Sequence, residues 1–176
     1  MDLDRLHEEI RVCQLCDLSR NRIKAVPGEG PCPAEIMLVG EAPGREEDLR
    51  GRPFVGRAGR LLDQALAEAG LQRSEVFITS VIKCRPPDNR RPKRHEIERC
   101  RSYLEAQMMM LNPRIVCLMG NVAIQTVLGK QGVTILRGQI WQDRFLVTYH
   151  PAAVLRNRNL MKDFVSDLKL ARRPRD

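Results

Sequence analysis

The chain has 176 residues, of which 43% are hydrophobic and 30% are charged, so it can bury a packed core and is not expected to be globally disordered. Thirty lysine and arginine residues against 22 acidic ones leave a formal net charge of +8, which favours a polyanionic partner, with nucleic acid as the default candidate. Apolar runs such as residues 115–119 are far too short to span a membrane, and no signal-peptide core is visible, so we expect a single soluble, cytoplasmic domain over residues 1–176.

Short apolar runs alternate with longer amphipathic ones along the chain. In chain order, the pattern first predicts a strand over 35–39, a helix over 57–69 and a strand over 75–82. A helix that Pro92 opens then ends near Leu111, and a strand follows over 114–119. Last come a short helix that Asn121 caps and that ends at Gly129, a strand over 144–149 and a basic helix over 159–172. Such alternation predicts a parallel sheet with helices on both faces. The basic end of the chain, ARRPRD, is expected to be frayed.

In a parallel sheet of this kind, ligands bind at the carboxyl ends of the strands. The loops that begin at Gly40, Ser80, Gly120 and His150 are therefore the places where a site is expected. His150 comes directly after the last predicted strand. By contrast, His7 and His95 lie in polar helical surroundings and are expected to be exposed.

The six cysteines are more consistent with metal ligands or buried thiols than with disulfides. Cys13 and Cys16 form a CxxC pair, Cys84 follows a predicted strand, and Cys100 lies on the inner face of the next helix. Four thiolates can hold a zinc ion or an iron–sulfur cluster, and from spacing alone zinc is the usual occupant, with four unrelated thiols as the alternative. Cys117, in the middle of a strand, is expected to be core.

Two loops rich in glycine follow the first strand. GEAPGREED, residues 40–48, combines glycines that let the backbone approach a ligand with carboxylates that can supply charge or a base. GRPFVGRAG, residues 51–59, places Phe54 between glycines, where it is either a stacking platform or a core residue.

Two further loops carry cations. CRPPDNRRP, residues 84–92, contains Arg85 and is suited to phosphate groups. In HPAAVLRNR, residues 150–158, Leu155 precedes Arg156, which gives either an apolar wedge beside a phosphate-binding cation or an ordinary helix-facing leucine. The methionines at 108–110 are expected to pack in the core.

Taken together, these segments resemble family 4 of the uracil-DNA glycosylases, the iron–sulfur branch of that superfamily. The matching stretches are VGEAPGREED, GRPFVGRAGRLLD, VFIT-VIKCRPP-NR and YHPAAVLR, in the expected order. The resemblance implies an α/β fold, a three-layer α/β/α sandwich around a four-stranded parallel sheet. It also implies that a [4Fe-4S] cluster, rather than zinc, is held by Cys13, Cys16, Cys84 and Cys100, with a structural role in fixing loops that meet DNA.

The activity that the resemblance implies is hydrolysis of the N-glycosidic bond of deoxyuridine in single- or double-stranded DNA, which initiates base excision repair. The base must first be flipped out of the stack. The residues implied at the base are Glu41, Ala42, Pro43, Phe54, Ser80 and His150. Among them, Phe54 stacks on the uracil, His150 donates to its O2, and Glu41 places or activates the water. Leu155, Arg156 and Arg85 meet the DNA, and Glu47 and Asp48 are weaker candidates as helpers.

Ser80 departs from the family pattern, which usually has asparagine at this position. An asparagine amide reads the N3–H and O4 edge of uracil and rejects cytosine, whereas a serine hydroxyl is shorter and carries one donor. Three outcomes follow: a water fills the gap, Asn89 or Asn121 takes over, or the pocket prefers another deaminated base. We expect uracil activity to be retained, because every other motif is intact.

Three other hypotheses stay open. The chain is alternatively a glycosylase for a different lesion, a non-catalytic iron–sulfur module that binds damaged DNA, or a zinc module. A monomer is the simplest expectation for its oligomeric state, and no protein partner is indicated by the sequence.

Overall fold

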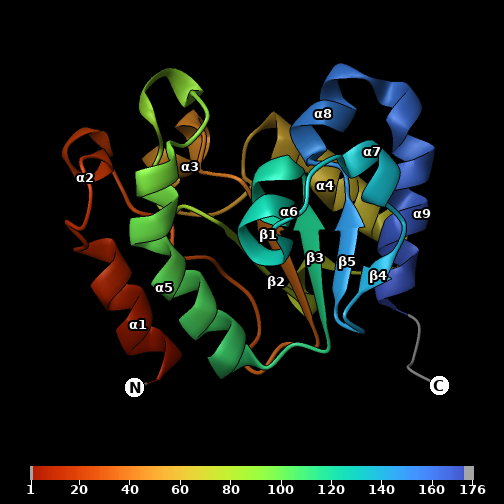
Figure 1. The fold of residues 1–176 in the computed structure, drawn as a ribbon, viewed down its shortest axis with the longest axis horizontal. Coiled ribbons are helices and arrows are strands. Elements are labelled where there is room, and N and C mark those ends of the chain that lie inside the picture. The colour runs from red at the N-terminus through yellow and green to blue at the C-terminus, as the bar shows by residue number, and fades with distance from the viewer. Residues whose placement is uncertain (1, 173–176) are drawn as a thin grey trace.

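The computed structural model describes residues 2–172, so most of the basic end of the chain lies outside the described residues. At its centre is a sheet with the strand order β2-β1-β3-β5-β4 (Figure 1). The strands are β1 (Ile36–Gly40), β2 (Val76–Ser80), β3 (Ile115–Met119), β4 (Ile140–Trp141) and β5 (Phe145–Thr148). Four of them pair in parallel, each within an apolar run that predicted a strand.

The predicted α/β class and the parallel core of the sheet are confirmed, but the count of four strands was one short. The additional strand, β4, pairs with β5 in antiparallel fashion. It has only two residues and is not buried, so it leaves no apolar run in the sequence.

Helices cover both faces of the sheet (Figure 1). α4 (Arg57–Glu68), α8 (Pro151–Arg156) and α9 (Met161–Ala171) share one hydrophobic cluster with one set of strand side chains, and α5 (Arg94–Leu111) and α6 (Asn121–Leu128) share another with the alternate set. Strands that are buried on both faces need apolar side chains at every position, which explains the continuous apolar runs.

A smaller third cluster lies beside the sheet, where α1 (Leu3–Arg11) packs next to α5 (Figure 1). Leu6, Ile10 and Leu18, which opens α2 (Leu18–Asn21), pack with Ile82 of the loop after β2. Cys84 and Cys100 belong to the same cluster. The packing of α1 and α2 thus brings the CxxC pair of the N-terminal segment toward the two distant cysteines.

Three local predictions were wrong. Asn121 does not cap α6, because its Oδ1 instead accepts from the backbone N–H groups that open α7 (Val133–Leu136), at 3.2 and 3.0 Å. His7 is buried rather than exposed, because α1 turns it toward α5, where its Nε2 lies 3.2 Å from the Gln107 amide nitrogen. Of the methionines at 108–110, Met108 and Met110 pack against core clusters as predicted, but Met109 is 82% exposed; Cys117 is fully buried as predicted.

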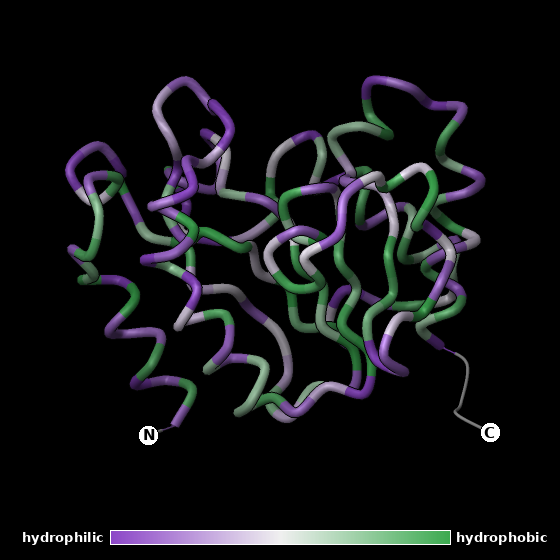
Figure 2. The backbone as a smooth tube through the Cα atoms, viewed as in Figure 1, coloured by the Kyte–Doolittle hydropathy of each residue, from purple (hydrophilic) through white to green (hydrophobic). Residues whose placement is uncertain are grey.

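β3 and β5 point upward as drawn, so their carboxyl ends face the upper edge of the molecule (Figure 1). Figure 2 shows hydrophobic strands at the centre and largely hydrophilic loops along this edge. The remaining short helices are α3 (Arg45–Arg50) and the 3-10 turns η1 (Arg73–Glu75), η2 (Pro87–Asn89) and η3 (Arg158–Leu160). Within residues 2–172, no helix has the length and apolar character needed to cross a membrane.

Candidate active site

A pocket of about 410 Å³ opens at the carboxyl ends of β1 and β2, beside the start of α8. Its volume falls within the range of ordinary small-molecule sites. The residues predicted for the site that line it are Glu41, Ala42, Pro43, Phe54, Ser80, His150 and Arg156. Arg85 and Leu155 are not among its lining residues. The structure thus brings together, in one cavity, residues from four separate loops.

The ring of Phe54 lies against the end of β1. A Cβ at Gly40 would come within 2.5 Å of the Phe54 Cζ atom and 3.3 Å of the Ser80 Oγ, so only glycine allows this approach. On its other side, the Phe54 ring centroid lies 5.6 Å from that of the His150 imidazole, at an interplanar angle of 37°. Phe54 is 8% exposed and packs on the core as well as lining the pocket, so it is a core residue, and its role as a stacking platform stays a prediction.

His150 is held in one tautomer by the helix that it begins. As the N-cap of α8, its Nδ1 accepts the backbone N–H of Ala152 at 3.0 Å. The neutral ring must therefore carry its proton on Nε2. That Nε2 is buried and has no hydrogen-bond partner among the described residues. An unpartnered buried donor is costly and rare, which indicates that a ligand in the pocket satisfies it.

Burial, together with a smaller effect of the nearby Arg156 guanidinium, lowers the pKa of His150 to about 4. The imidazole is therefore neutral near pH 7, and its Nε2–H acts as a donor rather than as an acid. A fixed donor in a site shielded from water stabilises negative charge that develops on a reacting group.

Glu41 provides a carboxylate without a partner. No described residue donates a hydrogen bond to its side chain, while its backbone carbonyl accepts from Ile82 at 3.1 Å and fixes the loop. Burial raises the pKa of Glu41, and the cations Arg91 and Arg156 oppose this shift. A half-buried carboxylate of this kind is suited to hold a water molecule or to accept its proton.

Glu47 and Asp48, the weaker candidates, use their carboxylates to hold loops. Oε2 of Glu47 accepts from the backbone N–H groups of Val55 and Gly56, both at 2.8 Å. Oδ1 of Asp48 accepts from the backbone N–H groups of Ile23 and Lys24, at 2.8 and 3.2 Å. Glu41 is therefore the acidic residue of the GEAPGREED loop that lines the pocket with its carboxylate free.

Ser80 lines the pocket at the end of β2, and its backbone carbonyl accepts from the buried Lys83 ammonium at 2.7 Å. Of the two asparagines considered as substitutes, Asn89 lines the same pocket, and its Oδ1 accepts from Arg85 at 2.7 Å. Asn121 is not a lining residue, because its side chain is bound to the start of α7. Asn89 alone of this pair is placed to contact a ligand.

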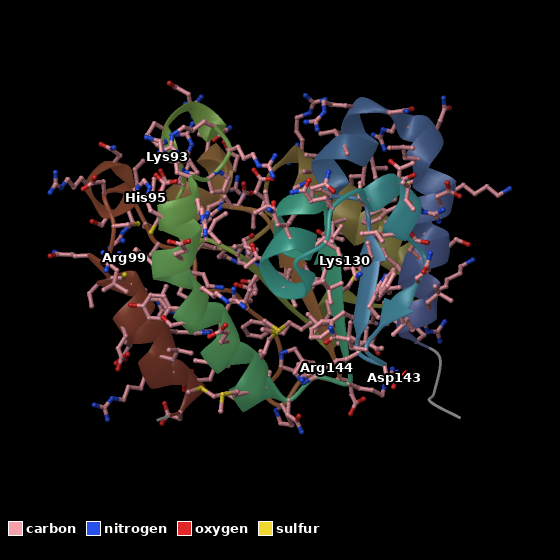
Figure 3. All side chains as sticks on the ribbon, viewed as in Figure 1. Lys93, His95, Arg99, Lys130, Asp143 and Arg144 are labelled. Carbon is pink, nitrogen blue, oxygen red and sulfur yellow. The ribbon has the colours of Figure 1, made fainter. Side chains whose placement is uncertain are left out.

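Cations surround the mouth of the pocket. Arg57, Arg90 and Arg156 line it, and Figure 3 shows Lys93 close to the start of α5 near the same loops. These charges suit a phosphate-bearing ligand. Leu155 is half-buried and packs against the core of α4, α8 and α9, so the side chain that the sequence offers as a wedge contacts its own fold here.

The four predicted metal-binding cysteines, Cys13, Cys16, Cys84 and Cys100, line one small cavity between α1, α2 and α5. Arg22 donates to the Cys84 sulfur at 3.2 Å, and Arg99, labelled in Figure 3, joins the lining from α5. Burial raises the pKa of Cys84, and raises that of Cys100 to about 11, so these thiols stay protonated unless a metal replaces the proton.

Four thiols around one cavity are a donor set that suits either an iron–sulfur cluster or a zinc ion. Within residues 2–172, no three histidine, cysteine, aspartate or glutamate side chains are arranged to hold one metal ion. Four thiolates on one zinc ion must all lie about 2.3 Å from it, whereas a cubane cluster spreads its four thiolates over different irons. N–H donors to ligand sulfurs, as from Arg22, are typical of such sites.

Two residues that shape the pocket from outside were not predicted. Lys83 is fully buried and donates to the Thr79 hydroxyl and the Gln107 amide oxygen, both at 2.7 Å. A lysine directly after an apolar run was the only indication of its burial. Arg73 donates to the backbone of the loop that carries Phe54, and nothing in its sequence neighbourhood indicates this contact.

Comparison with known proteins gives matches over nearly the whole chain. The family model described as "Uracil DNA glycosylase superfamily" matches residues 27–169. The chain is 45% identical to the Type-4 uracil-DNA glycosylase of Pyrobaculum aerophilum, with 97% of this chain and 93% of that protein covered. It is 41% identical to the protein of the same name from Archaeoglobus fulgidus (95% and 90% covered) and 38% identical to that from Thermotoga maritima (97% and 93% covered).

Proposed function

The chain belongs to the uracil DNA glycosylase superfamily, and from that membership we propose that it excises uracil from DNA in repair by hydrolysing the N-glycosidic bond of deoxyuridine. The observation that carries the proposal is the pocket in which the buried, unpartnered Nε2–H of His150 and the unpaired carboxylate of Glu41 meet beside the ring of Phe54.

Binding requires the base to leave the helix. Flipping costs about a few kcal/mol of unstacking and unpairing, and less at a mismatched base. Stacking of the flipped base on Phe54 contributes roughly 1–3 kcal/mol, by analogy with base–aromatic contacts in other proteins. Phosphate contacts from the arginines around the pocket mouth add sequence-independent affinity.

The C1′–N1 bond breaks heterolytically. The pair leaves with the uracil, whose O2 gains negative charge, and the Nε2–H of His150 donates to that oxygen. The sugar becomes cationic. The negative carboxylate of Glu41 stabilises this positive charge and orients a water molecule. As the water oxygen bonds to C1′, Glu41 accepts its proton, which leaves an abasic site and the uracil anion; the anion then takes up a proton from solvent to give free uracil.

The direct test incubates the protein with single- and double-stranded DNA that carries one uracil, followed by alkali. We expect strand breaks at the uracil and none in matched DNA with thymine at that position. DNA binding without breaks would contradict the proposal and favour a non-catalytic binding module.

Ser80 offers a second test, because its short side chain stands where the family usually has an amide. Parent and Ser80→Asn proteins are compared on uracil, hypoxanthine and xanthine substrates. We expect the parent to act on uracil and the variant to be roughly fivefold faster, since one added hydrogen bond is worth about 1 kcal/mol.

Faster release of hypoxanthine or xanthine than of uracil by the parent would instead assign a glycosylase for another deaminated base. Asn89→Ala serves as the companion variant. A marked loss of uracil excision in it would indicate that Asn89 has taken over base reading, since it lines the same pocket.

The proposal includes a [4Fe-4S] cluster held by Cys13, Cys16, Cys84 and Cys100. When bound, such a cluster links the segments that carry its ligands: the CxxC loop, the loop after β2, and α5. Arg22 then donates to a ligand sulfur and offsets part of the negative charge of the thiolates.

Cys84→Ala is expected to bleach the purified protein, lower its iron content and reduce its thermal midpoint by roughly 10 °C, because the neighbouring loops lose their common anchor. Cys32→Ala is the matched control, since Cys32 is exposed and lies outside the cysteine cavity. A Cys84→Ala protein with unchanged visible absorbance and iron content would remove this residue from the ligand set.

Residues 1–176 are further proposed to act as one glycosylase domain and as a monomer on DNA, in the cytoplasm and in association with the nucleoid. The oligomeric state is tested by measuring the sedimentation of the protein with and without a uracil-containing oligonucleotide.

A further inference from the structure

We infer that Arg73 is a positioning residue for the base-stacking ring: it fixes the backbone of Phe54 from outside the pocket and thereby sets where the flipped base stacks. This inference rests on the proposed function, because its effect is read in excision of uracil. Arg73 is not among the residues that line the pocket.

The backbone at Phe54 needs to be held. Phe54 has a φ of 48°, in the left-handed region that side chains other than glycine rarely adopt. It lies between Pro53 and Val55, in a segment that is neither helix nor strand. Without outside contacts, the loop has better conformations available, in which the ring leaves its place against Gly40 and His150.

Arg73 supplies such contacts from η1. Its Nη1 donates to the Phe54 carbonyl at 2.8 Å, and its Nη2 donates to the Pro53 carbonyl. The two carbonyls lie on either side of the Phe54 N–Cα bond, about which the unusual φ turns. A planar guanidinium can meet both at once, whereas an ammonium group lacks this fixed fork.

The guanidinium is itself anchored. Asp63 of α4 accepts from Nη1 at 2.9 Å, and Glu29 accepts from Nη2 at 3.2 Å. Glu29 is held in turn by Arg52, which donates to both of its carboxylate oxygens at 2.9 Å. The Arg73 side chain is only 22% exposed, so solvent screens these contacts weakly. Arg73 therefore acts as a fixed support rather than as a mobile surface cation.

The opposite side of the loop is fixed independently. Glu47 accepts from the backbone N–H groups of Val55 and Gly56, which follow Phe54. A Cβ at Gly59 of α4 would lie 1.9 Å from the Phe54 carbonyl oxygen, so only a glycine at this position lets the loop pack against the helix. Glu47 lines the pocket, but Arg73 does not, so a change at Arg73 reaches the base through Phe54.

A double-mutant cycle tests this dependence. The four proteins are the parent, Arg73→Ala, Phe54→Ala and the double variant, assayed for kcat and KM on single-stranded uracil DNA. We expect Arg73→Ala to lower kcat/KM about tenfold, mainly through KM, when Phe54 is present. In the Phe54→Ala background, the same change should alter kcat/KM by less than twofold, because the ring that Arg73 supports is gone.

Arg101→Ala is the matched control, because it also removes one arginine from an ion pair, with Glu105 at 2.7 Å, but Arg101 lies on α5 and does not line the pocket. We expect it to stay within twofold of the parent. Arg73→Lys should recover part of the loss, and Arg73→Gln replaces the alanine variant if that protein does not fold. Thermal midpoints of all variants show whether a loss of activity follows a loss of folding.

Equal tenfold losses in both backgrounds, or an Arg101→Ala protein as impaired as Arg73→Ala, would overturn the inference while leaving the glycosylase activity in place. A parent protein that releases no uracil would overturn the proposed function, and the inference with it.

Discussion

Replacing His150 with alanine is expected to slow uracil excision by about 10²–10³-fold, the usual cost of removing one fixed donor to a developing anion. The buried Nε2–H of His150 has no partner among residues 2–172, and its opposite nitrogen accepts from the Ala152 backbone. The loss should appear in the rate constant of bond cleavage, measured in single-turnover reactions with excess enzyme. The donor acts most strongly when negative charge develops on the uracil O2.

His95→Ala is the matched control for this variant. His95 is exposed on α5 and does not line the pocket, so its replacement should leave the single-turnover rate within twofold of the parent. A His150→Ala protein that excises uracil at nearly the parental rate would show that the leaving base is stabilised by another group.

Glu41→Gln is expected to lower the excision rate by about 10²–10⁴-fold, the range for loss of a general base. Glutamine keeps the size of the side chain but cannot accept a proton from water. Glu46→Gln provides the control, because Glu46 lies nearby on α3, pairs with Arg50 and does not line the pocket.

The pH dependence of the rate gives an independent readout of Glu41. Burial raises the pKa of this carboxyl, and only its ionised form accepts a proton, so excision should fall as the pH drops through that raised value. In Glu41→Gln, the residual rate should stay level down to about pH 4, near the lowered pKa of His150. The same acid limb in parent and variant would assign it to another group.

Much of the fold could be predicted because its parallel strands are buried on both faces and therefore appear as continuous apolar runs. The features that escaped prediction depend on contacts rather than on pattern. β4 is too short to leave a periodic signal. The burial of His7 arises from its contact with Gln107, a hundred residues away in the chain.

In the candidate site, too, the features that follow from sequence pattern could be predicted and those that depend on contacts could not. Glu41, Phe54, Ser80 and His150 share one pocket because the carboxyl ends of parallel strands meet at one edge, which the motif order already indicated. The tautomer of His150 and the role of Arg73 are set by backbone groups that come together only in the folded chain. Sequence patterns carry no trace of such contacts.

One border of the sheet is paired at Ile78 and the other ends in a strand of two residues, and this has a consequence for how the protein behaves at high concentration. Along β2, Glu29 exchanges two backbone hydrogen bonds with Ile78, at 3.0 and 2.8 Å, and along β5 the short β4 occupies the outer border. Exposed strand borders recruit strands from other molecules and start aggregation. Because one border is paired at Ile78 and the other is only two residues long, the sheet offers a short edge to a neighbouring copy, which disfavours the joining of molecules edge to edge.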